Sequence, residues 1–311
     1  MPRKSRAMSN KTLAHLLLLA VVAVWGATFA LVKGALNDAS PLLFNLLRMA
    51  LAAAALWIVN YRYLGGISRR TCFAGAVAGL FLAAGYQFQT VGLASTTPAK
   101  SGLITGLVVV FVPLLTTLPG VRPRASPRPR WTTAAGALSA FSGLVLLTTP
   151  TGTTLANVTG KMGRGDLLTL LCALAFAGHL LALAHLAPEI PARPLATLQI
   201  TFAALVMLLT LPLSRNLHLH LSLRLTVALA VTSLLATAAA FTIQTWAQQH
   251  IPPANTAILF TLEPVFAVAV SVLLLGDRMT LRSVLGAALI LCGIGMIELL
   301  ALPAPVAIEP A

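Results

Sequence analysis

The sequence is poor in acidic residues and in charge of either sign. It contains only seven Asp and Glu residues among 311 positions, beside 21 Lys and Arg. Charged residues make up 9% of the chain, whereas ordinary soluble domains contain about 25%. So few charges cannot cover the surface of a water-soluble globular enzyme. The composition excludes that class, together with disordered chains and coiled coils.

Cysteine is also scarce. Cys72, Cys172 and Cys292 are odd in number, far apart and set in apolar stretches. They indicate neither a disulfide framework nor a metal-ligand cluster, so we expect no metal and no cofactor. The sequence contains no nucleotide-binding loop, no HExxH pattern and no paired carboxylates. ATP-driven transport by this chain alone is therefore excluded.

Hydrophobic residues are abundant instead. They make up 58% of the chain, and the mean hydropathy is +0.90. A helix that crosses a bilayer needs about 20 apolar residues, so the composition predicts an all-α integral membrane protein within a lipid bilayer. The net charge of +14 does not indicate a nucleic-acid partner. The basic residues lie mostly between apolar runs, where membrane orientation requires them.

Apolar runs separated by short loops predict ten transmembrane helices. The first run is too long for the apolar region of a signal peptide, and it is retained as a helix. We divide the chain into two five-helix domains, residues 1–150 and 151–311. The expected spans are 13–33, 41–60, 72–92, 98–119, 132–149, 166–187, 194–213, 224–246, 253–275 and 281–302.

The two predicted domains show a weak internal repeat. QTVGLASTTPAKSG, which begins at Gln89, aligns with QTWAQQHIPPANTA, which begins at Gln244, at an offset of 155 residues. Pro113 aligns with Pro264 at an offset of 151, and we expect each proline to kink its span. Because five is an odd number, the second domain must insert upside down relative to the first. Inverted repeats around a midplane site are typical of secondary transporters.

The Lys and Arg residues of the short loops predict the orientation, because such residues favour the cytoplasmic side. One side of the predicted topology holds twelve of them and the other holds eight. The first domain produces this difference, whereas the second domain weakly favours the opposite orientation. Early spans usually dominate insertion, so we expect both termini to be cytoplasmic.

Several stretches of the sequence are distinctive. They are VWGATFALVKGAL, PLLFNLLRMALAA and TTPAKSGLITGLVVVFVPLL in the first domain, and LEPVF, LLLGDRMT and GAALILCGI in the second. These stretches resemble the ten-helix branch of the drug/metabolite transporter superfamily, whose chains contain two EamA-type domains. The resemblance implies eight helices around a central cavity, with the fifth and tenth spans at the periphery. It also implies an inner-membrane exporter of metabolites, amino acids or toxic organic solutes.

Charged groups near the bilayer centre are costly, and this makes them candidates for function. Arg48 and Glu263 have opposite charge and similar depth in the second and ninth spans. Arg48 suits a carboxylate or phosphate, which it could bind through two parallel hydrogen bonds. Glu263 suits a proton or an ammonium group. The alternative is a structural role, either as a buried ion pair or as partners of free backbone groups.

Polar and aromatic groups at similar depth complete the predicted cavity. Each of them has an alternative role in helix–helix hydrogen bonding or packing. The predicted coupling residue is Glu263. The predicted substrate-binding residues are Trp25, Thr28, Arg48, Tyr86, Gln87, Ser101, His179 and Gln244.

These observations predict a secondary transporter that exports small metabolites, such as amino acids or amphipathic organic solutes, by alternating access. Its expected partner is a small-molecule substrate. Proton exchange and uniport both remain open, as do a monomer and a homodimer. The alternative from another class is an integral membrane enzyme that acts on lipids. It is disfavoured because the interfacial loops offer only scattered candidates, namely His218, His220, Asp277 and Glu189.

Overall fold

The computed structural model describes residues 9–93, 95, 98–123, 130–148, 163–214, 216–270 and 280–299. Within these residues every regular element is helical, apart from one isolated antiparallel bridge between Ala39 and Leu219. Six helices are long and apolar enough to cross a membrane, and three further apolar helices are shorter. The chain is a multi-pass membrane protein.

Most predicted spans coincide with a single helix. These helices are α1 (Asn10–Ala35), α2 (Pro41–Asn60), α3 (Arg69–Leu93), α6 (Trp131–Thr148), α8 (Arg164–Leu186), α9 (Ala192–Thr210) and α14 (Leu281–Leu299). The eighth span contains α10 (Leu223–Ser233), a π-helical segment η4 (Leu234–Ala239) and α11 (Ala240–Ala247). The predicted ends of the ninth and tenth spans, at 271–275 and 300–302, lie outside the described residues.

The fourth and ninth predicted spans are each broken into two short helices. The pieces are α4 (Pro98–Thr105) and α5 (Val108–Leu115) in the fourth span, and α12 (Pro253–Phe260) and α13 (Glu263–Val270) in the ninth. The two breaks lie 155 residues apart, which is the same offset that aligns Gln89 with Gln244. Corresponding segments of the two halves are therefore broken at corresponding residues.

A proline accounts for only one of these breaks. Pro264 is the second residue of α13, close to the break between α12 and α13, but Pro113 lies inside α5, well beyond the break in its own span. The break in the fourth span therefore does not lie at Pro113, where a kink was predicted. The first break falls at Gly106, which has low helix propensity and is pressed against the side chain of Leu144 on α6.

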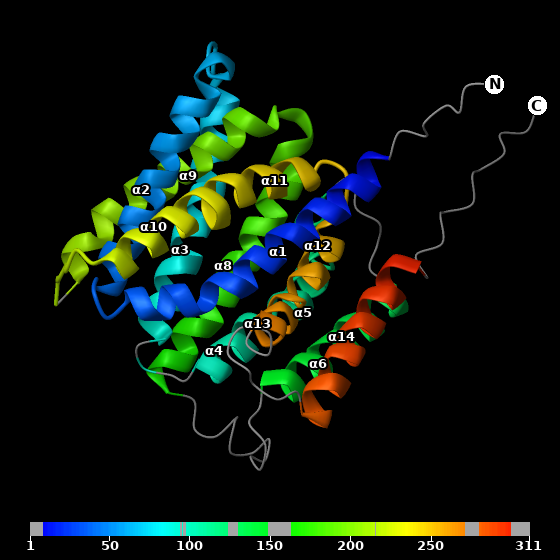
Figure 1. Cartoon of the computed structure of the whole chain (residues 1–311). Helices are drawn as coiled ribbons and strands as arrows, with labels where there is room; N and C mark the ends of the chain where they lie inside the picture. The colour runs from blue at the N-terminus through cyan, green and yellow to red at the C-terminus, as the bar shows by residue number, and fades with distance from the viewer. Residues whose placement is uncertain are drawn as a thin grey trace, which may run out of the picture.

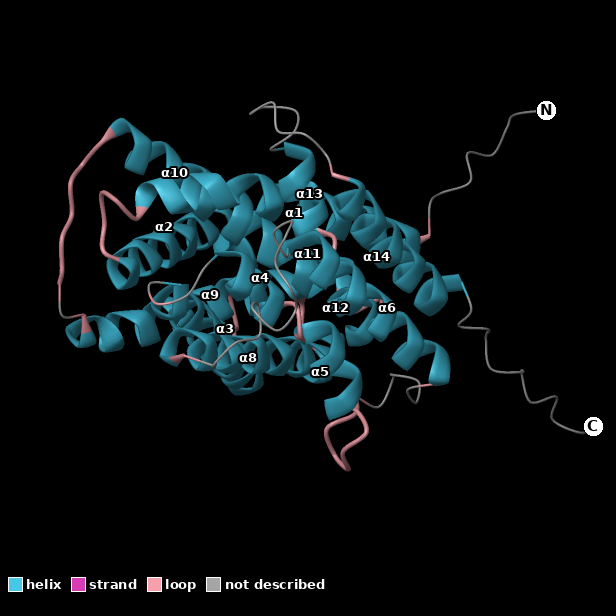
Figure 2. Cartoon of the chain, turned by 90° about the horizontal axis from the view of Figure 1, so that it is seen from below, coloured by secondary structure: helices cyan, strands magenta, loops and turns pink. Residues whose placement is uncertain are grey.

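Helices α6 and α14 lie side by side at one edge of the molecule (Figures 1 and 2). Their backbones approach closely at glycines. A Cβ atom on Gly286 would lie 2.7 Å from the Gly143 carbonyl oxygen, and one on Gly136 would lie 2.8 Å from that of Gly293. Small residues are used in this way where transmembrane helices pack without side chains between them.

The remaining helices of the two halves interdigitate. Helix α3 packs on α8 and α9, and α1 packs on α10, α11 and α13. A shared hydrophobic cluster joins α2, α3, α9 and α11, and its members include Met49, Leu82, Ile200, Met207 and Phe241. This packing sets the two halves face to face around the site described next.

Candidate substrate cavity

A cavity of about 390 Å³ lies between the two halves. Small-molecule sites commonly have volumes of roughly 300–1,000 Å³. Helices α1, α2, α3, α4, α8, α11 and α12 contribute to its wall, as does the start of α13, whereas α5 and α6 contribute only Val108 and Leu144. Eight of the nine predicted site residues line it, namely Trp25, Thr28, Arg48, Tyr86, Ser101, His179, Gln244 and Glu263.

Gln87 is the predicted residue that does not line the cavity. Its Nε2 donates a hydrogen bond of 2.7 Å to Oγ1 of Thr210 on the neighbouring α9. Successive residues of an α-helix project about 100° apart, and this hydrogen bond directs the Gln87 side chain toward α9. Tyr86 faces the cavity, and the expectation for Gln87 is corrected.

Several lining residues fall outside the predicted set. Asn45 lies one helical turn before Arg48 on α2, so the i, i+3 spacing could have revealed it. Its Nδ2 donates to Thr90 Oγ1 at 2.9 Å and to the Tyr86 carbonyl oxygen at 3.2 Å. The other additional polar and aromatic members are Gln89, Thr90, Thr105, Phe176, Phe241, Phe260 and Thr261.

Neutral groups hold the guanidinium of Arg48. Its Nε donates to Thr237 Oγ1 at 2.7 Å, and its Nη2 donates to the Tyr86 hydroxyl and to the Ala236 carbonyl oxygen, both at 3.1 Å. The guanidinium carbon lies 4.7 Å from the centre of the Tyr86 ring. Although Glu263 lines the same cavity, the described contacts of Arg48 include no ion pair with it. Among these described contacts, the buried Arg48–Glu263 ion pair that was the structural alternative is therefore not formed.

The π-helical segment η4 explains how Ala236 can accept these bonds. A π-helical turn departs from the regular i to i−4 ladder, and such turns often occur at functional sites. The Ala236 carbonyl oxygen accepts from Trp25 Nε1 at 2.8 Å as well as from Arg48 Nη2. One carbonyl of the second half thereby orients two cavity residues of the first half.

Aromatic rings form the apolar part of the cavity wall. Trp25 lies with its ring centroid 5.0 Å from Phe260 and 5.7 Å from Phe241. Tyr86 lies edge-on to Phe176 at 5.5 Å between ring centroids. Such rings offer a large apolar contact area with little loss of side-chain freedom, which suits the apolar portion of a solute.

Two glutamines have contrasting places near this wall. Gln199, which aligns with Arg48 at the 151-residue offset, does not line the cavity. Its Oε1 accepts from Nε2 of the buried His179 at 2.9 Å. Gln244 lines the cavity, and its Nε2 donates to Gln248 Oε1 at 3.1 Å, but its buried Oε1 has no hydrogen-bond partner. An unsatisfied buried acceptor is costly, so this atom suits a donor group of a bound solute.

A multi-pass helical protein with a polar, aromatic-lined cavity between its halves has the architecture of a membrane transporter. Comparisons with known proteins agree with this class. Residues 12–149 and residues 163–299 each match the EamA-like transporter family. The chain belongs to the EamA-like transporter family and so to the drug/metabolite transporter superfamily.

Individual relatives lead to the same class. An uncharacterized transporter of Archaeoglobus fulgidus is 30% identical over 92% of this chain and 86% of its own length. The uncharacterized transporter YoaV of Bacillus subtilis is 22% identical over 90% of this chain and 94% of its own length. A protein of known crystal structure shares the fold, with a TM-score of 0.76 at 20% identity over 93% of this chain and 99% of that one.

Proposed function

We propose that the protein is an inner-membrane secondary transporter that exports small amphipathic metabolites, with amino acids as the leading class. The cavity supports this proposal because one space combines a cation, a carboxylate, an unsatisfied amide oxygen and an aromatic wall. In this proposal the two halves rock around the cavity, and this motion opens the cavity to one side of the membrane and then to the other.

The placement of a zwitterionic solute follows from the contacts of each group. The described hydrogen bonds of Arg48 use Nε and Nη2 but not Nη1. A carboxylate of the solute would bind at Nη1. Its ammonium group would then lie at the free Oε1 of Gln244, and Glu263 would remain available for the proton. An apolar side chain would contact the rings of Trp25 and Phe260.

The proposal includes a topology of ten crossings in two inverted five-helix halves, with both termini cytoplasmic. The matching breaks in the fourth and ninth spans support the repeat. Lys and Arg in the loops of the first half support the orientation. Reporter fusions test it: Ala311 and a position near Arg124 should report the same side of the membrane. Opposite sides would contradict this topology.

Flux into proteoliposomes tests the proposed function directly. Purified protein should support saturable transport of labelled apolar amino acids, and unlabelled competitors that carry both charged groups should compete more strongly than those that lack one of them. Empty liposomes are the control for leakage. If no solute class moves faster than in empty liposomes, the proposal is wrong. Turnover of lipids in the same vesicles would then favour the alternative of a membrane enzyme.

Thr237 provides a test of the solute carboxylate site. In a Thr237→Val variant, Arg48 loses the bond that fixes Nε, and the KM for a carboxylate-bearing solute should rise about tenfold. Thr232→Val is the matched control, because the described hydrogen bond of the buried Thr232 hydroxyl is to the Ala228 carbonyl oxygen of its own helix, at 2.6 Å. Thr237→Ser should restore the wild-type KM. Equal changes in the two valine variants would show that Thr237 acts only on helix stability.

A further inference from the structure

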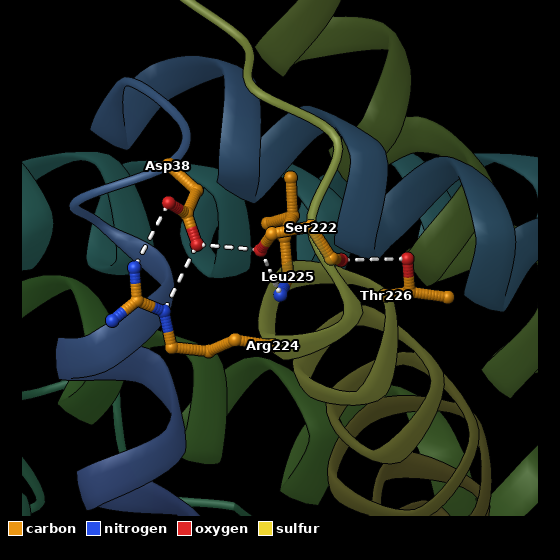
Figure 3. Close-up of polar contacts among 5 residues, drawn as sticks. All are labelled: Asp38, Ser222, Arg224, Leu225 and Thr226. Atoms are coloured by element: carbon orange, nitrogen blue, oxygen red, sulfur yellow. Dashed lines mark hydrogen bonds and ion pairs between the residues drawn. The ribbon is translucent and has the colours of Figure 1, made fainter.

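An ion pair joins the two halves beside the connection between α1 and α2 (Figure 3). Asp38 lies in this connection, and Arg224 is the second residue of α10. Arg224 Nε donates to Oδ2 and Nη2 to Oδ1 of Asp38, each at 2.9 Å, and the Ser222 hydroxyl donates to Oδ2 at 2.7 Å. The guanidinium of Arg224, followed by the Ser222 hydroxyl, lowers the pKa of Asp38 below its ordinary value, so the pair stays charged at neutral pH.

Backbone contacts strengthen this junction. The Ser40 amide donates to the His218 carbonyl oxygen at 3.0 Å, and the His220 amide donates to that of Asp38 at 2.7 Å. They flank the isolated bridge between Ala39 and Leu219. The ion pair and this bridge together tie the α1–α2 connection of the first half to the segment that precedes α10 in the second half.

A second ion pair joins Arg70 to Glu189. Here the first half supplies the arginine and the second half supplies the acidic residue, the reverse of the Asp38–Arg224 pair. Arg70 is the second residue of α3, as Arg224 is of α10. A serine two positions before each arginine accepts from the backbone amide of the helix, at 3.1 Å for Ser68 and 3.0 Å for Ser222.

The acidic partners correspond in the same way. Asp38 lies three residues before the start of α2, and Glu189 lies three residues before the start of α9. Each acidic residue pairs with the arginine of the opposite half. The two pairs are thus equivalent under the internal repeat.

The two pairs lie at opposite ends of the helix bundle. Asp38 precedes α2, whereas Arg70 follows it, and a helix of 20 residues is about 30 Å long. Figure 1 shows the α2–α3 connection at the top of the molecule and the segment before α10 at the lower left. Each face of the molecule therefore carries one ion pair between the halves.

The pairs differ in how firmly they are held. The Asp38 side chain is 13% exposed, whereas that of Glu189 is 61% exposed. Among the described residues, a backbone bridge accompanies only the Asp38 pair. The two equivalent junctions therefore differ in burial and in backbone pairing in this conformation. Such a difference is expected if only one of the two junctions is fully formed at a time.

We propose that Asp38–Arg224 and Arg70–Glu189 are reciprocal latches, each of which holds one face of the cavity closed while the opposite face opens. This inference rests on the proposed alternating-access transport. A cavity between two halves opens only where the halves separate, so the pair at that face must break. Partly exposed ion pairs suit this role because water compensates the separated charges. The tighter Asp38 latch favours closure of its own face in this structure.

Cysteine labelling tests the latches without requiring solute transport. A Thr28→Cys reporter in the cavity wall, combined with Cys72→Ser and Cys292→Ser, is labelled by a membrane-impermeant maleimide from each face in turn. Asp38→Asn should raise labelling from the Asp38 face about twofold to fivefold and lower it from the other face. Glu189→Gln should produce the opposite pattern. Arg224→Gln removes the other partner of the same ion pair and should produce the labelling pattern expected of Asp38→Asn. It replaces Asp38→Asn in the experiment if the Asp38→Asn protein folds poorly.

Two controls separate a latch from a general effect of charge. Arg62 lies near Arg70 in sequence, but it donates to the hydroxyl of its own neighbour Tyr61 at 2.8 Å and does not join the halves through that bond. Arg62→Gln should leave labelling unchanged. The exchanged pair Asp38→Arg with Arg224→Asp should restore the wild-type pattern.

The outcomes distinguish the latches from the transport function. Labelling that rises at the same face in both variants, or in neither variant, would overturn the latch proposal. Reciprocal labelling in a protein that moves no solute would support the latches and contradict the proposed transport.

Discussion

Replacement of Glu263 by Gln should abolish the dependence of solute flux on a pH gradient, while solute binding and folding are retained. Glu263 is a carboxylate in the wall of the cavity, at the break where α13 begins. Glutamine has nearly the same shape but cannot take up a proton. Coupled exchange therefore becomes gradient-independent, and only downhill movement of the solute remains. Flux into proteoliposomes with and without an imposed pH gradient measures the effect.

Glu263→Asp is the matched variant for this prediction. It keeps a titratable group at the same position, so the gradient dependence should persist with a changed rate. If Glu263→Gln remains fully gradient-driven, another group carries the proton and the coupling role of Glu263 is wrong. If the protein fails to fold, as judged by gel filtration in detergent, Glu263 has a structural role beside Pro264.

Replacement of Arg48 by Gln should remove the preference for solutes that carry a carboxylate. A charge-assisted hydrogen bond contributes about 1.5–3 kcal/mol, so the KM for an amino acid should rise roughly tenfold to a hundredfold. The KM for the corresponding amino acid amide should change little, because that solute has no anionic group. The amino acid and its amide are each used as an unlabelled competitor against the same labelled substrate, and the two inhibition curves give both changes in apparent affinity.

Arg48→Lys separates charge from geometry. Lysine keeps the positive charge but not the planar fork of donors, so an intermediate preference is expected. The aligned Gln199 on α9 is completely buried and bonded to His179 and Thr245, which shows that the fold accommodates glutamine at the matching place. Equal loss of acid and amide transport would indicate instead that Arg48 only holds α2 against η4 and Tyr86.

Much of the cavity could be predicted from the sequence for a simple physical reason. A polar group that faces lipid in the bilayer core is penalised, so polar and charged residues at mid-depth of apolar runs must face the protein interior. Arg48, His179 and Glu263 followed from this rule, and all three line the cavity. The rule does not say which interior surface a side chain faces, and Gln87 faces α9 rather than the cavity.

Proline was a weaker guide to the broken helices. Pro113 is accommodated inside α5, and the break in that span occurs at Gly106. Leu144 of α6 occupies the space that a side chain at Gly106 would need, so packing between these segments requires glycine there. The offset of 155 residues in the sequence relates the two breaks to each other, but neither break was predicted from it.

The sequence by itself determined the membrane class, the apolar spans and most of the polar residues of the cavity, because the bilayer imposes the same length and polarity on every crossing segment. Only the tertiary structure decided the partners of those residues. Arg48 contacts Thr237, and Asp38 contacts Arg224, across more than 180 residues of chain. Such pairings depend on how the two halves pack against each other, and no local pattern of residues encodes them.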